Sequence, residues 1–173
     1  MLGPLQVVDG GRRVPIPAAK HRVLLACLLL RASELVTVDE LAEAIWSDAL
    51  PEDPRNAVQV YVSRLRKLLG DAELLQGRPH GYVLAVARGD VDVGRFEWLV
   101  AQARDAAGVG DRETEATLLR RALALWRGEP LADVPSELLH REAVMVAGRA
   151  APGGAAASHR GRPCAWPARR AGG

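Results

Sequence analysis

The sequence contains no long hydrophobic run, since the longest unbroken apolar stretch, residues 23–30, has eight residues. A membrane-spanning helix needs about 20 such residues, so the sequence predicts no contact with a bilayer. The N-terminus also lacks a basic segment followed by an apolar one, the pattern of an export signal. Cysteine is scarce, and Cys27 and Cys164 lie far apart, which excludes a disulfide framework. These absences predict a cytoplasmic protein.

Motifs for catalysis and for cofactor or metal binding are missing as well. The sequence has no phosphate-binding glycine loop, no nucleophile elbow and no pair of carboxylates at a catalytic spacing. No acid or cysteine cluster accompanies the four histidines, which are His21, His80, His140 and His159. We therefore predict a protein that is not an enzyme and holds no metal or cofactor.

Charge is distributed unevenly, although the net charge is only +2. Residues 33–53 contain seven acidic residues and no basic one, whereas residues 54–88 contain six basic and two acidic residues. Residues 91–147 contain seven basic and ten acidic residues, and residues 148–173 contain five arginines and no acid. The alternation near the start of the chain predicts an acidic and a basic surface on one small domain.

Two short strands and a buried helix are predicted at the start of the chain. Residues 5–8 and 13–16 are strand-like, and the Asp9-Gly10-Gly11 sequence between them favours a tight turn. Residues 18–32 have a helical pattern and are apolar on almost every side. Such a helix is expected at the centre of a domain, where every side is covered.

A second and a third helix follow, separated by a polar turn. The second begins at Thr37 in a capping-box pattern and ends near Trp46. The third occupies residues 54–69, with Asp53 at its cap, proline at its first position and Gly70 after its end. Its apolar residues share one side, which predicts a buried stripe of Val58, Val62, Leu65 and Leu69.

A β-hairpin completes this part of the chain. Residues 74–76 and 82–86 are strand-like, and the loop between them carries Arg78 and His80. Strands, three helices and a hairpin follow one another in this order in winged helix-turn-helix domains. We therefore predict an α+β winged helix-turn-helix over residues 1–88, with the hairpin as its wing.

Residues 91–147 have a purely helical pattern. Apolar residues recur with helical spacing over residues 92–107 and again over residues 111–126, and the link between these segments is short. The second segment places Leu119, Leu123 and Trp126 on its apolar face. We predict an antiparallel all-α hairpin of the tetratricopeptide (TPR-like) kind.

A shorter helix is expected over residues 136–147. From residue 148 onward, alanine, glycine, arginine and proline dominate. Such a segment cannot bury enough apolar surface to offset the entropy lost on ordering. We expect residues 148–173 to form a disordered tail.

The polar side of the third helix carries residue types that recognise DNA. An α-helix fits the major groove, where arginine can donate two hydrogen bonds to guanine and asparagine can pair with adenine. The residues expected to face a duplex are Arg64, Asn56, Ser63, Lys67 and Val60. On the flank of the helix, the residues expected to contact phosphates are Arg66, Arg55 and Gln59. On the wing, Arg78 and His80 are expected to contact the DNA backbone or the minor groove.

Other interpretations of the same residues stay open. A basic helix face is often merely solvated, and Trp46 can pack in the core or donate its indole N–H to a phosphate. Tyr61 and Tyr82 suit packing better than base stacking. The helices of residues 91–147 can also dock a partner protein, which would make the chain a protein-interaction module.

Several segments resemble the antibiotic regulatory protein (SARP) family of actinobacterial transcriptional activators. They are LGPLQVVDGG, AAKHRVLLACLLLRA, VDELAEAIW, RNAVQVYVSRLRKLLG and GYVL. The family's DNA-binding domain is of the OmpR-like, response-regulator type. FEWLVAQARDAA and LLRRALALWRGEPLADV resemble the opening of the bacterial transcriptional activator domain that follows it. The resemblance covers residues 2–147.

The resemblance implies a promoter-binding regulator of secondary-metabolite genes that binds direct repeats of double-stranded DNA as a dimer and recruits RNA polymerase. Arg64 matches the family's base-reading arginine. Positions that contact DNA or phosphate are matched by Asn56, Ser63, Arg66 and Trp46. No receiver domain accompanies them, so any link to phosphorelay, two-component signalling is one of domain ancestry. The resemblance leads us to expect an activator domain truncated after its first helices, so a non-activating fragment of a larger regulator is the alternative.

Overall fold

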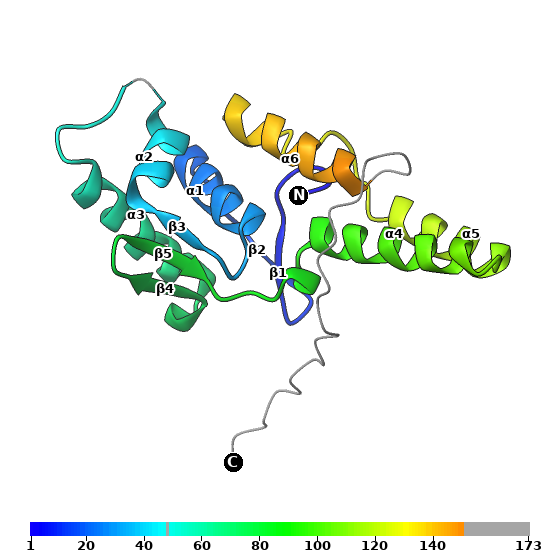
Figure 1. Ribbon diagram of the computed structural model, residues 1–173. Coiled ribbons are helices and arrows are strands. Elements are labelled where there is room, and N and C mark those ends of the chain that lie inside the picture. The colour runs from blue at the N-terminus through cyan, green and yellow to red at the C-terminus, as the bar shows by residue number, and fades with distance from the viewer. Residues whose placement is uncertain (48, 151–173) are drawn as a thin grey trace, which may run out of the picture.

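The chain, described by a computed structural model over residues 1–47 and 49–150, begins with a mixed α and β part. This part contains β1 (Val7–Asp9), β2 (Arg12–Val14), α1 (Ala19–Leu30), β3 (Leu35–Thr37), α2 (Val38–Trp46), α3 (Pro54–Leu69), β4 (Leu75–Arg78) and β5 (Gly81–Leu84). The second part contains α4 (Asp92–Gly108), α5 (Arg112–Leu123) and α6 (Glu137–Ala150) (Figure 1). The short helices η1 (Ala72–Leu74) and η2 (Arg88–Asp90) connect these elements. The predicted winged helix-turn-helix followed by a helical hairpin is confirmed.

The strands form two small antiparallel sheets. β1 and β2 make a hairpin whose turn contains Gly10 and Gly11, both at positive φ, as the sequence predicted. The other sheet has the order β3-β5-β4. β3 was not predicted, because its three residues become a strand only by pairing with β5, where Val36 lies opposite Tyr82. This strand ties the segment before α2 to the wing.

Helix α1 is the central helix, as predicted. It lies between α2 and α6 (Figure 1) and also contacts α3. Eight of its twelve residues are buried, including Leu24 and Leu28, which are wholly inaccessible. Cys27 is buried among them, and this burial raises the pKa of its thiol to about 12. The thiol is therefore a packing group.

The ends of α2 and α3 are fixed by the predicted caps. Thr37 and Glu40 form a complete capping box at the start of α2. Asp53 accepts a hydrogen bond from the Asn56 backbone N–H at the start of α3, and Gly70 ends that helix in the left-handed conformation. The inner stripe of α3 consists of Val58, Val62 and Leu65, while Leu69 is only half-buried.

The wing is tighter than predicted. β4 and β5 continue as far as Arg78 and Gly81, so the turn between them has only two residues, Pro79 and His80. β5 ends at Leu84, two residues before the predicted end. A Cβ at Gly81 would lie 2.1 Å from the Val36 carbonyl oxygen, so only glycine allows β3 and β5 to approach so closely.

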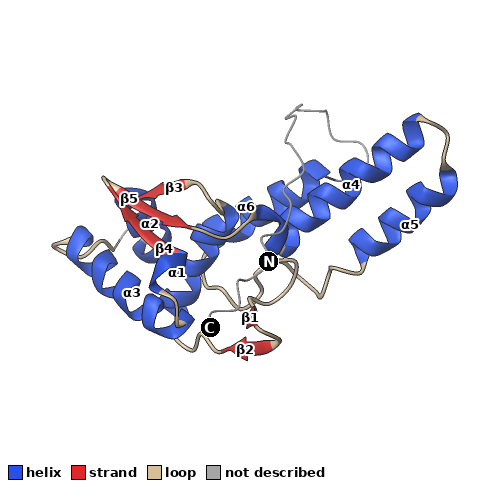
Figure 2. Ribbon diagram, turned by 90° about the horizontal axis from the view of Figure 1, so that it is seen from below, coloured by secondary structure: helices blue, strands red, loops and turns tan. Residues whose placement is uncertain are grey.

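Helices α4 and α5 pack along each other as the predicted antiparallel hairpin (Figure 2). The predicted apolar face of α5 needs correction, because the helix ends at Leu123 and this side chain is 65% exposed. Ala122 is the buried residue of α5, and Trp126 lies beyond the helix. Trp126 nevertheless contacts Phe96 edge to face, with 5.8 Å between the ring centroids.

Helix α6 joins the two parts of the chain. It packs against both α4 and α1, and its Leu139 and Val146 belong to the same hydrophobic core as the buried residues of α1. The helix runs to Ala150, three residues further than predicted, and residues 151–173 of the predicted tail lie outside the described residues. Arg31 forms ion pairs with Glu40 of α2 and Glu142 of α6. The helical part is thus held directly against the winged helix.

Two further features concern the residues that the structure describes. None of their helices combines the length and the apolar character that crossing a membrane requires. None of their histidine, cysteine and carboxylate side chains gather in threes around a space for a metal ion. His159 lies outside these residues.

The capping box predicts a measurable stability effect of Thr37→Ala. The Glu40 backbone N–H donates to Thr37 Oγ1 over 3.2 Å, and the variant loses this bond. We expect the free energy of unfolding to fall by about 1 kcal/mol in urea titrations, with Thr37→Ser retaining most of it. Equal losses in both variants would contradict a role for the hydroxyl.

The same motif predicts a pH dependence. Hydrogen bonds from the Thr37 backbone and hydroxyl hold the pKa of Glu40 below its ordinary value, with a smaller contribution from Arg31. A carboxyl with a depressed pKa stabilises the fold above its unfolded-state pKa, and this contribution is lost as the pH falls through the folded-state pKa. Acidification should therefore cost the wild type more stability than it costs Thr37→Ala.

Candidate nucleic-acid interface

The side of α3 opposite its inner stripe is open to solvent. All five residues predicted to face a duplex are exposed there, and we call them the outward face: Asn56, Val60, Ser63, Arg64 and Lys67. Arg64 and Lys67 form no hydrogen bond or ion pair with any residue in the described part of the chain. Their charges are therefore available to an external partner.

The flanks of α3 are less uniform. Arg55 and Gln59 are exposed beside the outward face, as predicted. Arg66 is half-buried, and its Nε donates a hydrogen bond to the Leu75 carbonyl oxygen over 2.8 Å. This contact ties α3 to strand β4 of the wing, and no local pattern predicts it. A phosphate contact by Arg66 stays a prediction.

An aromatic cluster lies along the edge of α3 that carries Tyr61, opposite the edge that carries Arg66. The Trp46 and Tyr61 rings meet edge to face with 5.7 Å between centroids, and Tyr61 meets His21 in the same way at 5.1 Å. Trp46 is half-buried, so it packs in the cluster while part of the ring stays accessible. Its indole N–H has no hydrogen-bond partner in residues 1–47 and 49–150. The geometry thus accommodates both interpretations of Trp46.

His21 lies behind this cluster at the start of α1. It is buried, and neither ring nitrogen has a hydrogen-bond partner among the described residues. Burial, and to a smaller extent the nearby charge of Arg64, lowers the pKa of His21 below its ordinary value.

The wing presents two exposed side chains near its tip. Arg78 donates a hydrogen bond to the Gln76 side chain, and His80 occupies the turn with φ at 70°. The His80 carbonyl oxygen accepts a hydrogen bond from the Val38 N–H over 3.0 Å. The tip is therefore anchored to the start of α2, which fixes its position relative to α3.

Two family models match the two parts of the chain. Residues 13–84 match the model described as transcriptional regulatory protein, C terminal, and residues 91–151 match the bacterial transcriptional activator domain. The regulatory protein AfsR of Streptomyces coelicolor is 39% identical over 147 residues, covering 84% of this chain and 15% of AfsR. The transcriptional regulatory protein EmbR of Mycobacterium tuberculosis is 37% identical over 139 residues, covering 78% of this chain and 36% of EmbR.

A solved structure shows the same arrangement. The structure of Mycobacterium tuberculosis EmbR in complex with a low affinity phosphopeptide has a TM-score of 0.78 and 34% sequence identity, and the match covers 86% of this chain and 42% of that chain. This chain is a homologue of the AfsR and EmbR regulators. It spans less than half the length of either.

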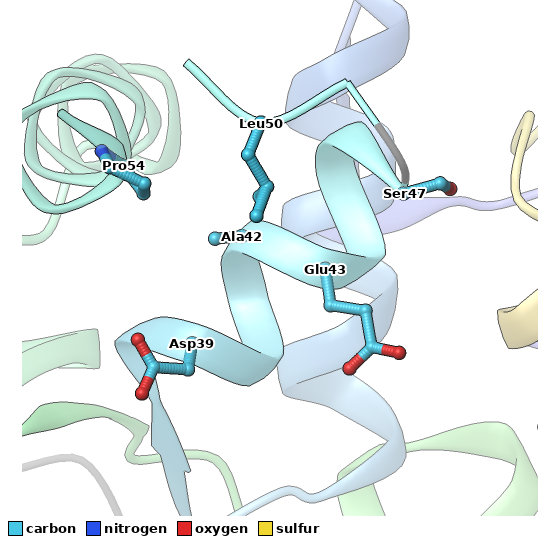
Figure 3. A pocket seen from close by; sticks show the side chains of 6 residues that line it. All are labelled: Asp39, Ala42, Glu43, Ser47, Leu50 and Pro54. Carbon is cyan, nitrogen blue, oxygen red and sulfur yellow. The ribbon is translucent and has the colours of Figure 1, made fainter. Parts of the chain in front are cut away.

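In this AfsR and EmbR homologue, an acidic surface lies on α2. A shallow hollow of about 400 Å³ lies between α2 and the start of α3 (Figure 3). Its lining residues are Asp39, Ala42, Glu43, Ser47, Leu50 and Pro54. The lining has two carboxylates and no basic group, so it repels phosphate. The hollow is therefore separate from the basic outward face.

One cation near α3, Lys20, was not among the residues predicted to contact DNA. The Lys20 ammonium lies over the Trp46 ring, 5.1 Å from its centroid. Lys20 comes at the start of α1, far from α3 in the sequence, and its place depends on the packing of α1 against α2 and α3. The only available signal was that the sequence has just two lysines, Lys20 and Lys67.

The Arg66–Leu75 hydrogen bond predicts that Arg66→Ala destabilises the fold. Loss of the bond between α3 and β4 should lower the free energy of unfolding by about 1 kcal/mol, measured by thermal or urea unfolding. Arg55→Ala is the matched control, because Arg55 is exposed on the same helix without such a bond. Equal stability of the two variants would contradict the structural role of Arg66.

Proposed function

We propose that the chain is a transcription regulator that binds double-stranded DNA in a sequence-specific manner through α3. The observation that carries this proposal is the outward face, where the charges of Arg64 and Lys67 have no partner within the described residues. The names of the homologous proteins AfsR and EmbR support the same conclusion, since both are called regulatory proteins.

The chemistry of the outward face suits the major groove. The guanidinium of Arg64 can donate two parallel hydrogen bonds to O6 and N7 of guanine, and the Asn56 amide can pair with adenine. Ser63 has a hydroxyl that can pair with either base, and Val60, 40% exposed, suits contact with a thymine methyl group. The ammonium group of Lys67 can donate a hydrogen bond to a phosphate or to guanine.

Phosphate contacts would set the position of α3 in the groove. Arg55 is exposed in the first turn of α3, where its guanidinium can reach a phosphate. Arg78 and His80 at the anchored wing tip suit the backbone or the adjacent minor groove. Such contacts hold the protein in register without reading the sequence themselves.

The chain's further activities are proposed from its resemblance to the antibiotic regulatory protein family and from residues 91–151, which match the bacterial transcriptional activator domain. We propose that it acts in the cytoplasm on direct repeats as a dimer, contacts RNA polymerase, and activates genes of secondary metabolism. Its relation to phosphorelay systems is one of domain ancestry, through the match of residues 13–84 to a regulatory-protein C-terminal domain.

Arg64→Ala tests this function. A duplex that the wild-type chain enriches from a random-sequence pool serves as the ligand, and unrelated duplexes measure non-specific binding. The variant should lose about 1–3 kcal/mol of binding free energy for the enriched duplex in fluorescence titrations and discriminate less well at one base pair. Non-specific affinity should change much less.

Two further variants separate recognition from charge. Arg64→Lys keeps the charge but cannot make the two-pronged contact, so it should lose specificity as well. Arg121→Ala removes the same charge from the exposed surface of α5 and should leave binding unchanged. Enrichment of no duplex by the wild type, or full specificity in Arg64→Ala, would contradict the assignment.

A further inference from the structure

Lys20, which is exposed, and the half-buried Trp46 form a pair beside α3. The ammonium lies over the indole ring at 5.1 Å from its centroid, and Lys20 forms no ion pair with a carboxylate of the described chain. The face of an indole ring is electronegative and attracts an ammonium group. The ring therefore restrains a side chain that would otherwise move freely, without neutralising its charge.

The Lys20–Trp46 pair is connected to α3 through Tyr61. Trp46 contacts Tyr61, and Tyr61 lies one turn before Arg64 on α3. The charge of Arg64 also reaches His21, the neighbour of Lys20 in α1. Cationic groups from α1 and α3 thus lie along one edge, with the Trp46–Tyr61 contact between them.

The pair lies on the opposite edge of α3 from the wing. At 100° per residue, Tyr61 lies about 120° to one side of the centre of the outward face, and Arg66 lies about 100° to the other side. Arg66 is bonded to Leu75 of the wing, whereas Tyr61 contacts Trp46. A major groove has a phosphate backbone on each side, so with α3 in the groove, as proposed above, its two edges would face different DNA strands.

We propose that Lys20 binds a backbone phosphate of the DNA, on the strand that passes α3 on the side away from the wing, and that the Trp46 ring positions its ammonium there. The proposal rests on the DNA-binding function proposed above. The ammonium donates a charge-assisted hydrogen bond to the phosphate oxygen. The indole N–H of Trp46, which has no partner among the described residues, is available to the same phosphate. Contacts on both sides of the groove would fix the tilt of α3 within it.

The experiment compares the wild type, Lys20→Met, Lys20→Arg and Arg121→Met as full chains. Met keeps an apolar stem on Trp46 and removes the charge, while Arg121→Met removes one charge at a distant exposed site. Affinities are measured over a range of salt concentrations for the enriched duplex and for unrelated duplexes. Thermal unfolding of each variant shows whether it is folded.

Lys20→Met should weaken binding to all duplexes by the same factor, about fivefold at 0.15 M salt, because one counterion-releasing contact is lost. The slope of log K against log salt should become shallower by about 0.9. Lys20→Arg should retain the wild-type slope, and Arg121→Met should behave as the wild type. An unchanged affinity and slope in Lys20→Met would overturn the proposal.

Neutral methylphosphonates placed singly along each strand locate the contact. One substitution on the strand away from the wing should weaken the wild type but not weaken Lys20→Met any further. Equal effects on both proteins at every position would contradict the assignment to Lys20. If the wild type still binds its enriched duplex specifically, that result would contradict only the role of Lys20 and not the role of α3. Failure of the wild type to bind any duplex would overturn both proposals.

Discussion

The burial of the inner stripe of α3 is the constraint on which the interface depends. Val58, Val62 and Leu65 are each at most 1% exposed, in contact with the hydrophobic core around α1. Burying one such side chain contributes about 1.5–3 kcal/mol, so the rotation of α3 about its axis is strongly fixed. Every residue of the outward face is exposed because the stripe is buried. The Arg66–Leu75 hydrogen bond and the Trp46–Tyr61 contact then hold the two edges of the helix.

The helical part of the chain also packs against the core that fixes α3. Helix α6 packs on α1, the helix that also supports α3, and Arg31 pairs with carboxylates of both α2 and α6. Before the start of α6, Asp133 accepts a hydrogen bond from the Leu5 N–H over 2.6 Å. A shift of α6 would therefore reach α2 and α3 through packed side chains, which gives the activator-domain segment a physical route to the proposed DNA contact.

Local signals were sufficient to predict the helices of the interface. Caps at Thr37 and Asp53 and the glycine at position 70 act within a few residues, and the spacing of apolar residues showed which side of α3 is exposed. What the sequence could not show depends on distant pairing. β3 forms only because it pairs with β5. Arg66 bonds to Leu75 of the wing, and Lys20 lies over Trp46 because α1 packs against α2. The apolar face of α5 was extrapolated to Trp126, although the helix ends at Leu123.

Hydrogen exchange on the full chain, with and without the duplex it enriches from a random pool, tests the central claim most directly. Bound DNA should slow the exchange of amides in α3 and at the wing tip, and leave α5, which packs along α4, unchanged. Protection confined to α4, α5 or α6, with α3 exchanging as fast as in the free protein, would contradict the account.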